Sequence, residues 1–321
     1  MSGLRQLIEL LAITYRSWQE DKAPRLGAAL AYYTVFSIPP LLILLIGIAS
    51  LVFDSADVQG RFLHTLEDLV GPQGASAIHD MLASPRSEQP GVLATIIGML
   101  TLLLGASAVF EHLKDAINTV WEIEPKPTKG RLAFAKKYLS SITVLLGTGF
   151  LLLVSLVVST LLTALGDTIQ PYLPGGEGLW TAIDLLFSLA VISFLFALLY
   201  RYIPDAIVAW KDALLGGLVT SILFNVGRYL IGFYLGSTHV GSAFGAAGSL
   251  VVLLVWVYYS SQIFFFGAEF TKAYATLYGS NIVPEPHARP VTEEARRQQG
   301  IPRRRGSGAA DPHGTKGPPV R

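Results

Sequence analysis

The sequence predicts an all-α fold: a polytopic membrane protein with six transmembrane helices, both termini in the cytoplasm, and a first helix kinked at Pro39 and Pro40. Three observations support this prediction. Hydrophobic residues make up 51% of the chain and charged residues only 15%, whereas a soluble globular protein carries roughly 25% charged residues. The apolar residues are gathered in six long runs, and the lysines and arginines alternate between the segments that join those runs.

Each of the six apolar runs is long enough to cross a bilayer, which takes about 20 residues for roughly 30 Å of hydrocarbon. The runs cover residues 26–53, 91–110, 138–166, 179–200, 213–236 and 237–268. The charged side chains inside them are Asp184, Arg228 and, when it carries a proton, His239. Because a backbone in lipid must satisfy its own hydrogen bonds, we expect each run to be a helix, with the last one beginning near Gly245.

The distribution of basic residues predicts the orientation, because lysine and arginine mark the cytoplasmic segments of a membrane protein. Of the 24 lysines and arginines, 21 lie in the N-terminal segment, the second and fourth loops and the C-terminal tail. The first loop holds only Arg61 and Arg86, the third and fifth loops hold none, and Arg228 lies within a span. This alternation places both ends of the chain in the cytoplasm.

The chain divides into three regions. Residues 1–25 form a cytoplasmic amphipathic helix, residues 26–280 form the six-helix transmembrane domain with an external helical loop at 54–90, and residues 281–321 form a basic cytoplasmic tail. The tail is rich in Pro, Gly and Arg, so we expect it to be disordered and attracted to anionic headgroups. Nucleic acid is not an expected partner, because the topology already accounts for the basic charge.

The N-terminal helix presents one apolar face. Five residues recur on it at helical spacing: Leu4, Leu7, Leu11, Tyr15 and Trp18. Two interpretations stay open. The helix either lies in the membrane interface or packs against other cytoplasmic segments.

Several motifs resemble the YihY/virulence factor BrkB family. They are AALAYYTVFSIPPL at 28–41, SAVF at 107–110 followed by Leu113, Ala116, Ile117, Asn118 and Trp121, then Arg201, Tyr202, Pro204, Asp205 and Trp210, and finally FGAAG at 244–248, WVYYSSQ at 256–262 and GAEF at 267–270. They occur in the family's order over roughly residues 10–280. The resemblance implies a bacterial inner (plasma) membrane protein. Some members of the family are linked to serum resistance or to lipid export, and the older ribonuclease label is regarded as a misassignment.

The sequence does not favour an enzyme. Cysteine is absent, which excludes a thiolate metal site or a cysteine nucleophile. The histidines are dispersed at His64, His79, His112, His239, His287 and His313. No metal-binding pair, serine elbow or phosphate-binding loop is present. We therefore expect no catalytic residue, no cofactor and no metal ligand.

Polar residues within the spans are the candidates for a functional site, because they are costly in lipid. Helical stripes run along the fifth span at Gly217, Ser221, Asn225, Arg228 and Gly232, and along the sixth at Tyr258, Gln262, Phe265 and Glu269. We expect the small residues to serve close helix packing. Asn225, Arg228, Tyr258, Gln262 and Glu269 are candidates for a cavity or substrate path.

Three further expectations concern the same candidate path. Pro39 and Pro40 should kink the first helix and free backbone carbonyls near Ser37, as at many transport sites. Asp184 and Arg228 lie at similar depth on consecutive helices and are predicted to interact, with Asn225 supplying a hydrogen bond. A lysine follows Glu269 three residues on, so Glu269 and Lys272 should form an ion pair, with a proton-relay role as the alternative.

Taken together, the residues and the resemblance favour a protein that moves a lipid or envelope amphiphile across or within the membrane. The alternative is a non-transporting scaffold for envelope machinery, and a membrane-embedded enzyme is less favoured. The expected partners are membrane lipids or a lipid-like substrate.

The topology can be tested with reporter fusions. Fusions after Lys126 and Lys211 should report a cytoplasmic location, and fusions at Gly74 and Gly175 an external one, because basic segments stay inside. Alkaline phosphatase and fluorescent protein activities measure the two locations. One firm contradiction at either central loop would break the six-span prediction.

Overall fold

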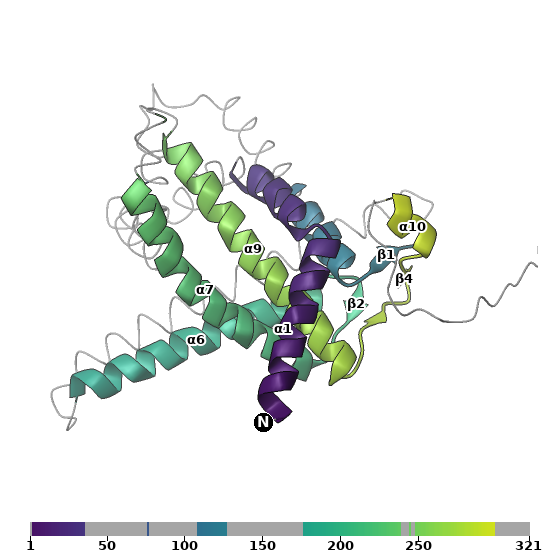
Figure 1. Cartoon of the computed structure of the whole chain (residues 1–321), viewed down its shortest axis with the longest axis horizontal. Coiled ribbons are helices and arrows are strands. Elements are labelled where there is room, and N and C mark those ends of the chain that lie inside the picture. Colours follow the sequence, from purple (N-terminus) through teal and green to yellow (C-terminus); the bar gives the residue numbers. More distant parts are fainter. Residues whose placement is uncertain are drawn as a thin grey trace, which may run out of the picture.

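The computed structural model describes residues 2–35, 76, 108–126, 176–238, 244 and 248–298, which are the coloured parts of Figure 1. Its labelled helices are α1 (Ser2–Glu20), α6 (Gly176–Tyr202), α7 (Trp210–Thr238), α9 (Gly248–Leu277) and α10 (Glu293–Gln298). Residues 23–35 and 108–120 are also helical. The strands are β1 (Ile123–Pro125), β2 (Ala206–Ile207), β3 (Val283–Pro284) and β4 (Ala288–Pro290).

Three helices in the described part of the chain are long and apolar enough to cross a membrane: Leu185–Tyr202, Trp210–Thr238 and Gly248–Leu277. They correspond to the fourth, fifth and sixth predicted spans. Their nearly uniform hydrophobicity around the helix is typical of lipid-embedded segments. The helical membrane class is therefore confirmed. The third predicted span, most of the second, and the kink at Pro39 and Pro40 lie outside the described residues.

The contact between α6 and α7 depends on small residues. A Cβ atom on Gly217 would overlap the Ser193 carbonyl oxygen and the Ala197 nitrogen of α6. One turn later, the Oγ atoms of Ser221 and Ser193 lie 2.7 Å apart. Close backbone approach and interhelical hydroxyl bonds are the usual means of holding membrane helices together. The predicted packing role of Gly217 and Ser221 is confirmed.

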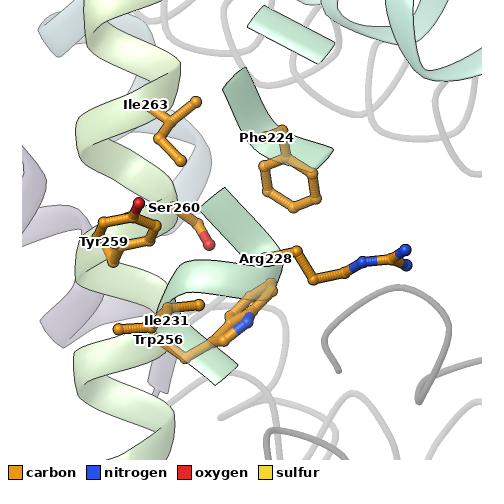
Figure 2. A pocket seen from close by; sticks show the side chains of 7 residues that line it. All are labelled: Phe224, Arg228, Ile231, Trp256, Tyr259, Ser260 and Ile263. Atoms are coloured by element: carbon orange, nitrogen blue, oxygen red, sulfur yellow. The ribbon is translucent and has the colours of Figure 1, made fainter. Parts of the chain in front are cut away.

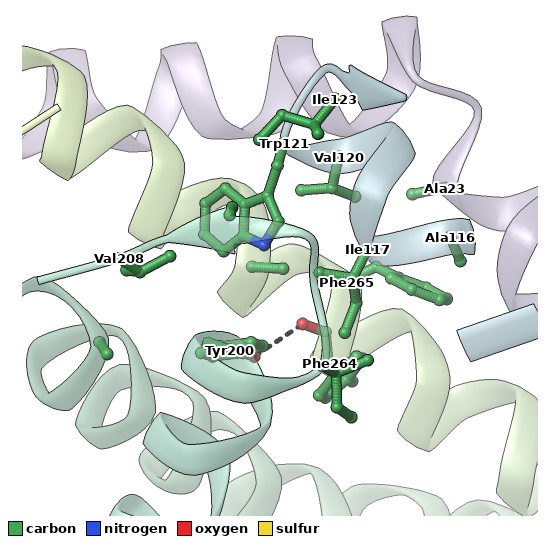
Figure 3. Close-up of a cluster of buried hydrophobic side chains, with 14 of the residues drawn as sticks. Ala23, Ala116, Ile117, Val120, Trp121, Ile123, Tyr200, Val208, Phe264 and Phe265 are labelled. Carbon is green, nitrogen blue, oxygen red and sulfur yellow. Dashed lines mark hydrogen bonds between the residues drawn. The ribbon is translucent and has the colours of Figure 1, made fainter. Parts of the chain in front are cut away.

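The core lies where α6, α7 and α9 meet the helix over residues 108–120 (Figure 3). Tyr200 is fully buried, donates a hydrogen bond of 2.8 Å to the Phe264 carbonyl, and lies 2.9 Å from Thr220 Oγ1. Trp121 and Phe265 pack around it from the neighbouring elements. Because the tyrosine hydroxyl has a partner on each of two other helices, burial of its ring carries no unsatisfied polar group.

The segment after α9 is folded, which corrects the expectation of a disordered tail from residue 281 onward. β3 pairs with β2, and β4 pairs with β1, both antiparallel. Residues 281–298 thus contain two strands that pair with segments far earlier in the chain, and α10 follows the second of these strands (Figure 1). Composition gave the wrong answer because it registers Pro, Gly and Arg content but not the backbone partners at residues 123–125 and 206–207. Residues 299–321 lie outside the described part.

Helix α1 combines the two interpretations left open by its sequence. Its Leu10 packs against Phe270 and Ala273 of α9, so the packing alternative is confirmed for that face. Four residues of the predicted apolar face are exposed, among them Leu4 at 67% and Leu7 at 48%, whereas Trp18 packs against the main core. An interfacial location of this second face stays a prediction.

Substitution of Gly217 by Ala tests the α6–α7 contact. The added methyl meets backbone atoms that cannot move aside, so we expect a loss of about 1–3 kcal/mol in stability, typical of overpacking. Thermal unfolding in detergent measures the change. Gly236→Ala is the matched control, because Gly236 lies exposed near the end of the same helix. Equal stability of the two variants would contradict the close packing.

Candidate functional site

The candidate path residue Arg228 lines a groove between α7 and α9 (Figure 2). We call it the α7–α9 groove, and its lining residues are Phe224, Arg228, Ile231, Trp256, Tyr259, Ser260 and Ile263. The α7 members and the α9 members recur at intervals of three or four residues, so each set shares one helix face. The lining side chains leave no space for a water molecule between them, so the groove is a shallow surface depression and not one of the roughly 300–1,000 Å³ pockets that enclose a drug-sized ligand.

The charge of Arg228 lies at the edge of this groove. Its side chain is half-buried and extends away from the apolar groups of α9 (Figure 2). The guanidinium carbon is 5.2 Å from the centre of the Tyr229 ring, within range of a cation–π contact. The groove therefore joins an apolar, aromatic wall to one fixed positive charge.

The structure does not bring all the candidate residues to this groove. The Asn225 side chain donates a hydrogen bond of 2.9 Å to the Ser221 carbonyl of its own helix. Tyr258 packs on the cluster that includes Ala31 and Val35 of the first predicted span. The Asp184 side chain, Ser37, Pro39 and Pro40 lie outside the described residues, so the Asp184–Arg228 pair stays a prediction.

Gln262 lies against the helix over residues 23–35. A Cβ atom on Gly27 would overlap the amide nitrogen of Gln262. Both polar atoms of this side-chain amide are buried, and neither has a hydrogen-bond partner within the described ranges. Gln262 and Tyr258 therefore face the first helix, and Arg228 faces a separate groove.

Glu269 belongs to a third location, a cluster of five charged residues that we call the polar junction: Asp21, Glu122, Glu269, Lys272 and Arg296. The Lys272 Nζ atom lies 3.3 Å from Asp21, 3.0 Å from Glu122 and 3.8 Å from Glu269. The Arg296 guanidinium lies 3.9 Å from Asp21 and 3.0 Å from Glu122. The predicted Glu269–Lys272 ion pair is confirmed, but it is buried rather than exposed at an interface.

The junction is built from helix ends. Asp21 and Glu122 stand in the turns that close α1 and the helix over residues 108–120. These turns contain Lys22 at φ 54° and Glu122 itself at φ 55°, the left-handed conformation that commonly ends helices. Lys272 comes from α9 and Arg296 from α10. Four separate parts of the chain thus contribute charge to one site.

Asp205 organises a neighbouring network that sequence reasoning missed. Its carboxylate accepts contacts from Lys114 at 2.6 Å, His287 at 2.8 Å and Asn118 at 3.0 Å. Burial by itself would raise the pKa of Asp205, but the bonds from Lys114 and His287 outweigh it and hold that pKa below its ordinary value of 3.8. Asn118 and Asp205 are 87 residues apart, so no local motif could have signalled the contact.

Asp205, Glu285 and His287 could offer ligands to a metal ion, since one atom from each lies within 4.8 Å of the others. The sequence had placed His287 in a tail expected to be disordered, with no metal site expected. The Lys114 ammonium lies 2.6 Å from one carboxylate oxygen of Asp205. The arrangement therefore works as an ion-pair network in which Lys114 holds the cationic position.

Comparison with known proteins decides the family. A family model described as "Virulence factor BrkB" matches residues 14–292. The chain belongs to the virulence factor BrkB family. This confirms the resemblance drawn from the motifs and makes the chain an integral membrane protein of a bacterial family. No solved structure matches it.

Curated relatives of this BrkB family chain are named UPF0761 membrane proteins. The one from Pseudomonas paraeruginosa is 31% identical, over 81% of this chain and 61% of the relative. The one from Pseudomonas aeruginosa strain PAO1 is 32% identical, over 77% and 58%. A shorter relative from Alteromonas mediterranea is 28% identical, over 83% and 87%. The chain thus spans about 60% of the length of the first two.

Removal of the Asp205 charge tests the network. Asp205→Asn should cost about 1–3 kcal/mol, because it removes charged hydrogen bonds from a buried group. The pKa of Asp205 is lower in the folded protein than its ordinary value of 3.8. The wild-type protein should therefore be more stable than Asp205→Asn by the full amount at pH values above 3.8. This difference in stability should disappear as the pH falls through the pKa of Asp205 in the folded protein. Thermal unfolding in detergent from pH 3 to pH 7 measures it. A wild-type advantage that grows with acidity would contradict this account.

Proposed function

We propose that this protein moves a lipid or envelope amphiphile across or within the bacterial inner membrane, with six spans and both termini cytoplasmic. The observation that carries the proposal is the position of Arg228, half-buried on a membrane-spanning helix at the edge of an apolar, aromatic groove. Partners in this proposal are membrane lipids, with anionic headgroups also attracted to the basic tail. It assigns the chain no catalytic reaction, no cofactor and no nucleic acid.

The cost of a charge in lipid supports a substrate role for Arg228. An arginine at the centre of a transmembrane helix costs about 2.5–3.5 kcal/mol on insertion scales. Arg228 precedes the end of α7 at Thr238 by ten residues, or about 15 Å of helix at roughly 1.5 Å per residue. The Tyr229 ring already lies beside the guanidinium, and in this proposal an anionic headgroup adds to that contact. Guanidinium groups bind phosphate and carboxylate through two parallel hydrogen bonds.

The groove fits part of an amphiphile rather than the whole. Its aromatic walls at Phe224, Trp256 and Tyr259 favour contact with methylene groups or a headgroup edge. The α7–α9 groove holds no enclosed space, so the acyl chains in this proposal stay in the surrounding lipid. A negatively charged headgroup at Arg228 with its chains in the bilayer would satisfy both parts of the site.

Reconstitution in liposomes tests the proposal. Wild-type protein should accelerate leaflet exchange of a fluorescent anionic phospholipid relative to empty vesicles. Arg228→Gln should slow this exchange about tenfold or more, because a charged hydrogen bond contributes about 1.5–3 kcal/mol. Arg228→Lys should retain part of the rate, since it keeps the charge and loses the two-bond geometry.

Arg25→Gln is the matched control, because Arg25 is exposed and the variant loses the same charge. It should exchange lipid at the wild-type rate. Exchange no faster than in empty vesicles, across anionic and zwitterionic lipids, would instead favour a non-transporting scaffold. Turnover of a lipid in detergent would favour an enzyme.

A further inference from the structure

The polar junction contains one more acidic group than basic groups. Asp21, Glu122 and Glu269 supply three carboxyls, and Lys272 and Arg296 supply two cations. The cations are shared between Asp21 and Glu122, each of which lies within 3.3 Å of the Lys272 ammonium. Among the described residues, the cation that lies near Glu269 is Lys272, at 3.8 Å, beyond hydrogen-bond distance. The excess negative charge therefore falls on Glu269.

The surroundings of Glu269 are dry. The residue is 0% exposed, and neither carboxyl oxygen has a hydrogen-bond partner among the described residues. An ionised carboxylate removed from water costs several kcal/mol unless hydrogen bonds replace its hydration.

We propose that Glu269 is a buried proton-binding site, and that the assembled polar junction holds its carboxyl in the neutral, protonated form. The proton removes the charge of the carboxyl that no hydrogen bond compensates among the described residues. It also converts one oxygen of Glu269 from an acceptor into a donor. Asp21 and Glu122 are the neighbouring carboxyl groups, and each of them contacts both Lys272 and Arg296.

Release of this proton requires the junction to open. The charged groups of the junction come from four segments: Asp21 from the turn after α1, Glu122 from the turn before β1, Arg296 from α10, and Lys272 from α9, the helix that also carries Glu269. Arg296 is 4% exposed, so the C-terminal segment screens the acids from water. Displacement of α10 and β4 would withdraw one cation and admit water, which lets Glu269 ionise. Proton binding and docking of residues 283–298 are therefore coupled.

Infrared difference spectroscopy of the full-length protein in detergent tests the site directly. Wild-type protein at pH 7 should show the carbonyl band of a protonated carboxyl. Glu269→Gln should lose that band, and Glu124→Gln should keep it. Glu124 is the matched control, because it lies in the adjoining strand and pairs with the exposed Arg289. Glu269→Asp should move the band without removing it, so the assignment stands even where Glu269→Gln does not fold.

Thermal unfolding gives a second readout that does not depend on transport. As pH rises from 5 to 9, wild-type protein should lose its bound proton and its melting temperature should fall relative to Glu269→Gln by about 2–4 °C or more. Identical carboxyl bands in wild type and Glu269→Gln would overturn the proposal. So would a difference in melting temperature that stays constant over this pH range, because Glu269 would then be ionised throughout.

Discussion

The described structure depends on the buried contact between Lys272 and the three acids around it. This one ammonium joins the turn after α1, the turn before β1 and the last membrane-spanning helix. Arg296 connects the same acids to the C-terminal segment. Removal of one partner from a buried group of this kind leaves an uncompensated charge, which costs about 3–5 kcal/mol. The packing of Leu10 on α9 and the pairing of β1 with β4 both take place around this centre.

The two ends of α9 place charged groups in different surroundings. Towards the start of α9, Trp256 and Tyr259 line the α7–α9 groove together with Arg228 of α7. Towards its end, Lys272 is enclosed by acids from other segments. At the first location, the Arg228 side chain extends away from the apolar groups of α9 (Figure 2). At the second location, the chain itself supplies the acidic partners of Lys272.

The sequence predicted much of the fold and only part of the site. Hydrophobic runs located α6, α7 and α9, because a run of some 20 apolar residues has few stable alternatives to a transmembrane helix. Helical spacing found the packing role of Gly217 and Ser221, and the Glu269–Lys272 pair one turn apart. Contacts such as Lys272 with Asp21 join residues 251 positions apart. The spacing of residues along the sequence carries no information about such long-range contacts. Amino-acid composition predicted disorder after residue 282, where the structure has β3 and β4.

The return of the C-terminal segment imposes an order on biosynthesis. Asp21, Glu122 and β1 are made early, but Arg296 and β4, which pair with them, come from the end of the described chain. At about 5–20 residues per second, the ribosome needs roughly 10–30 s to pass from residue 125 to residue 296. During that interval the acids lack Lys272 and Arg296, and the backbone of β1 lacks its partner. The helices can enter the membrane one by one, but the junction closes only after residue 296 has been made.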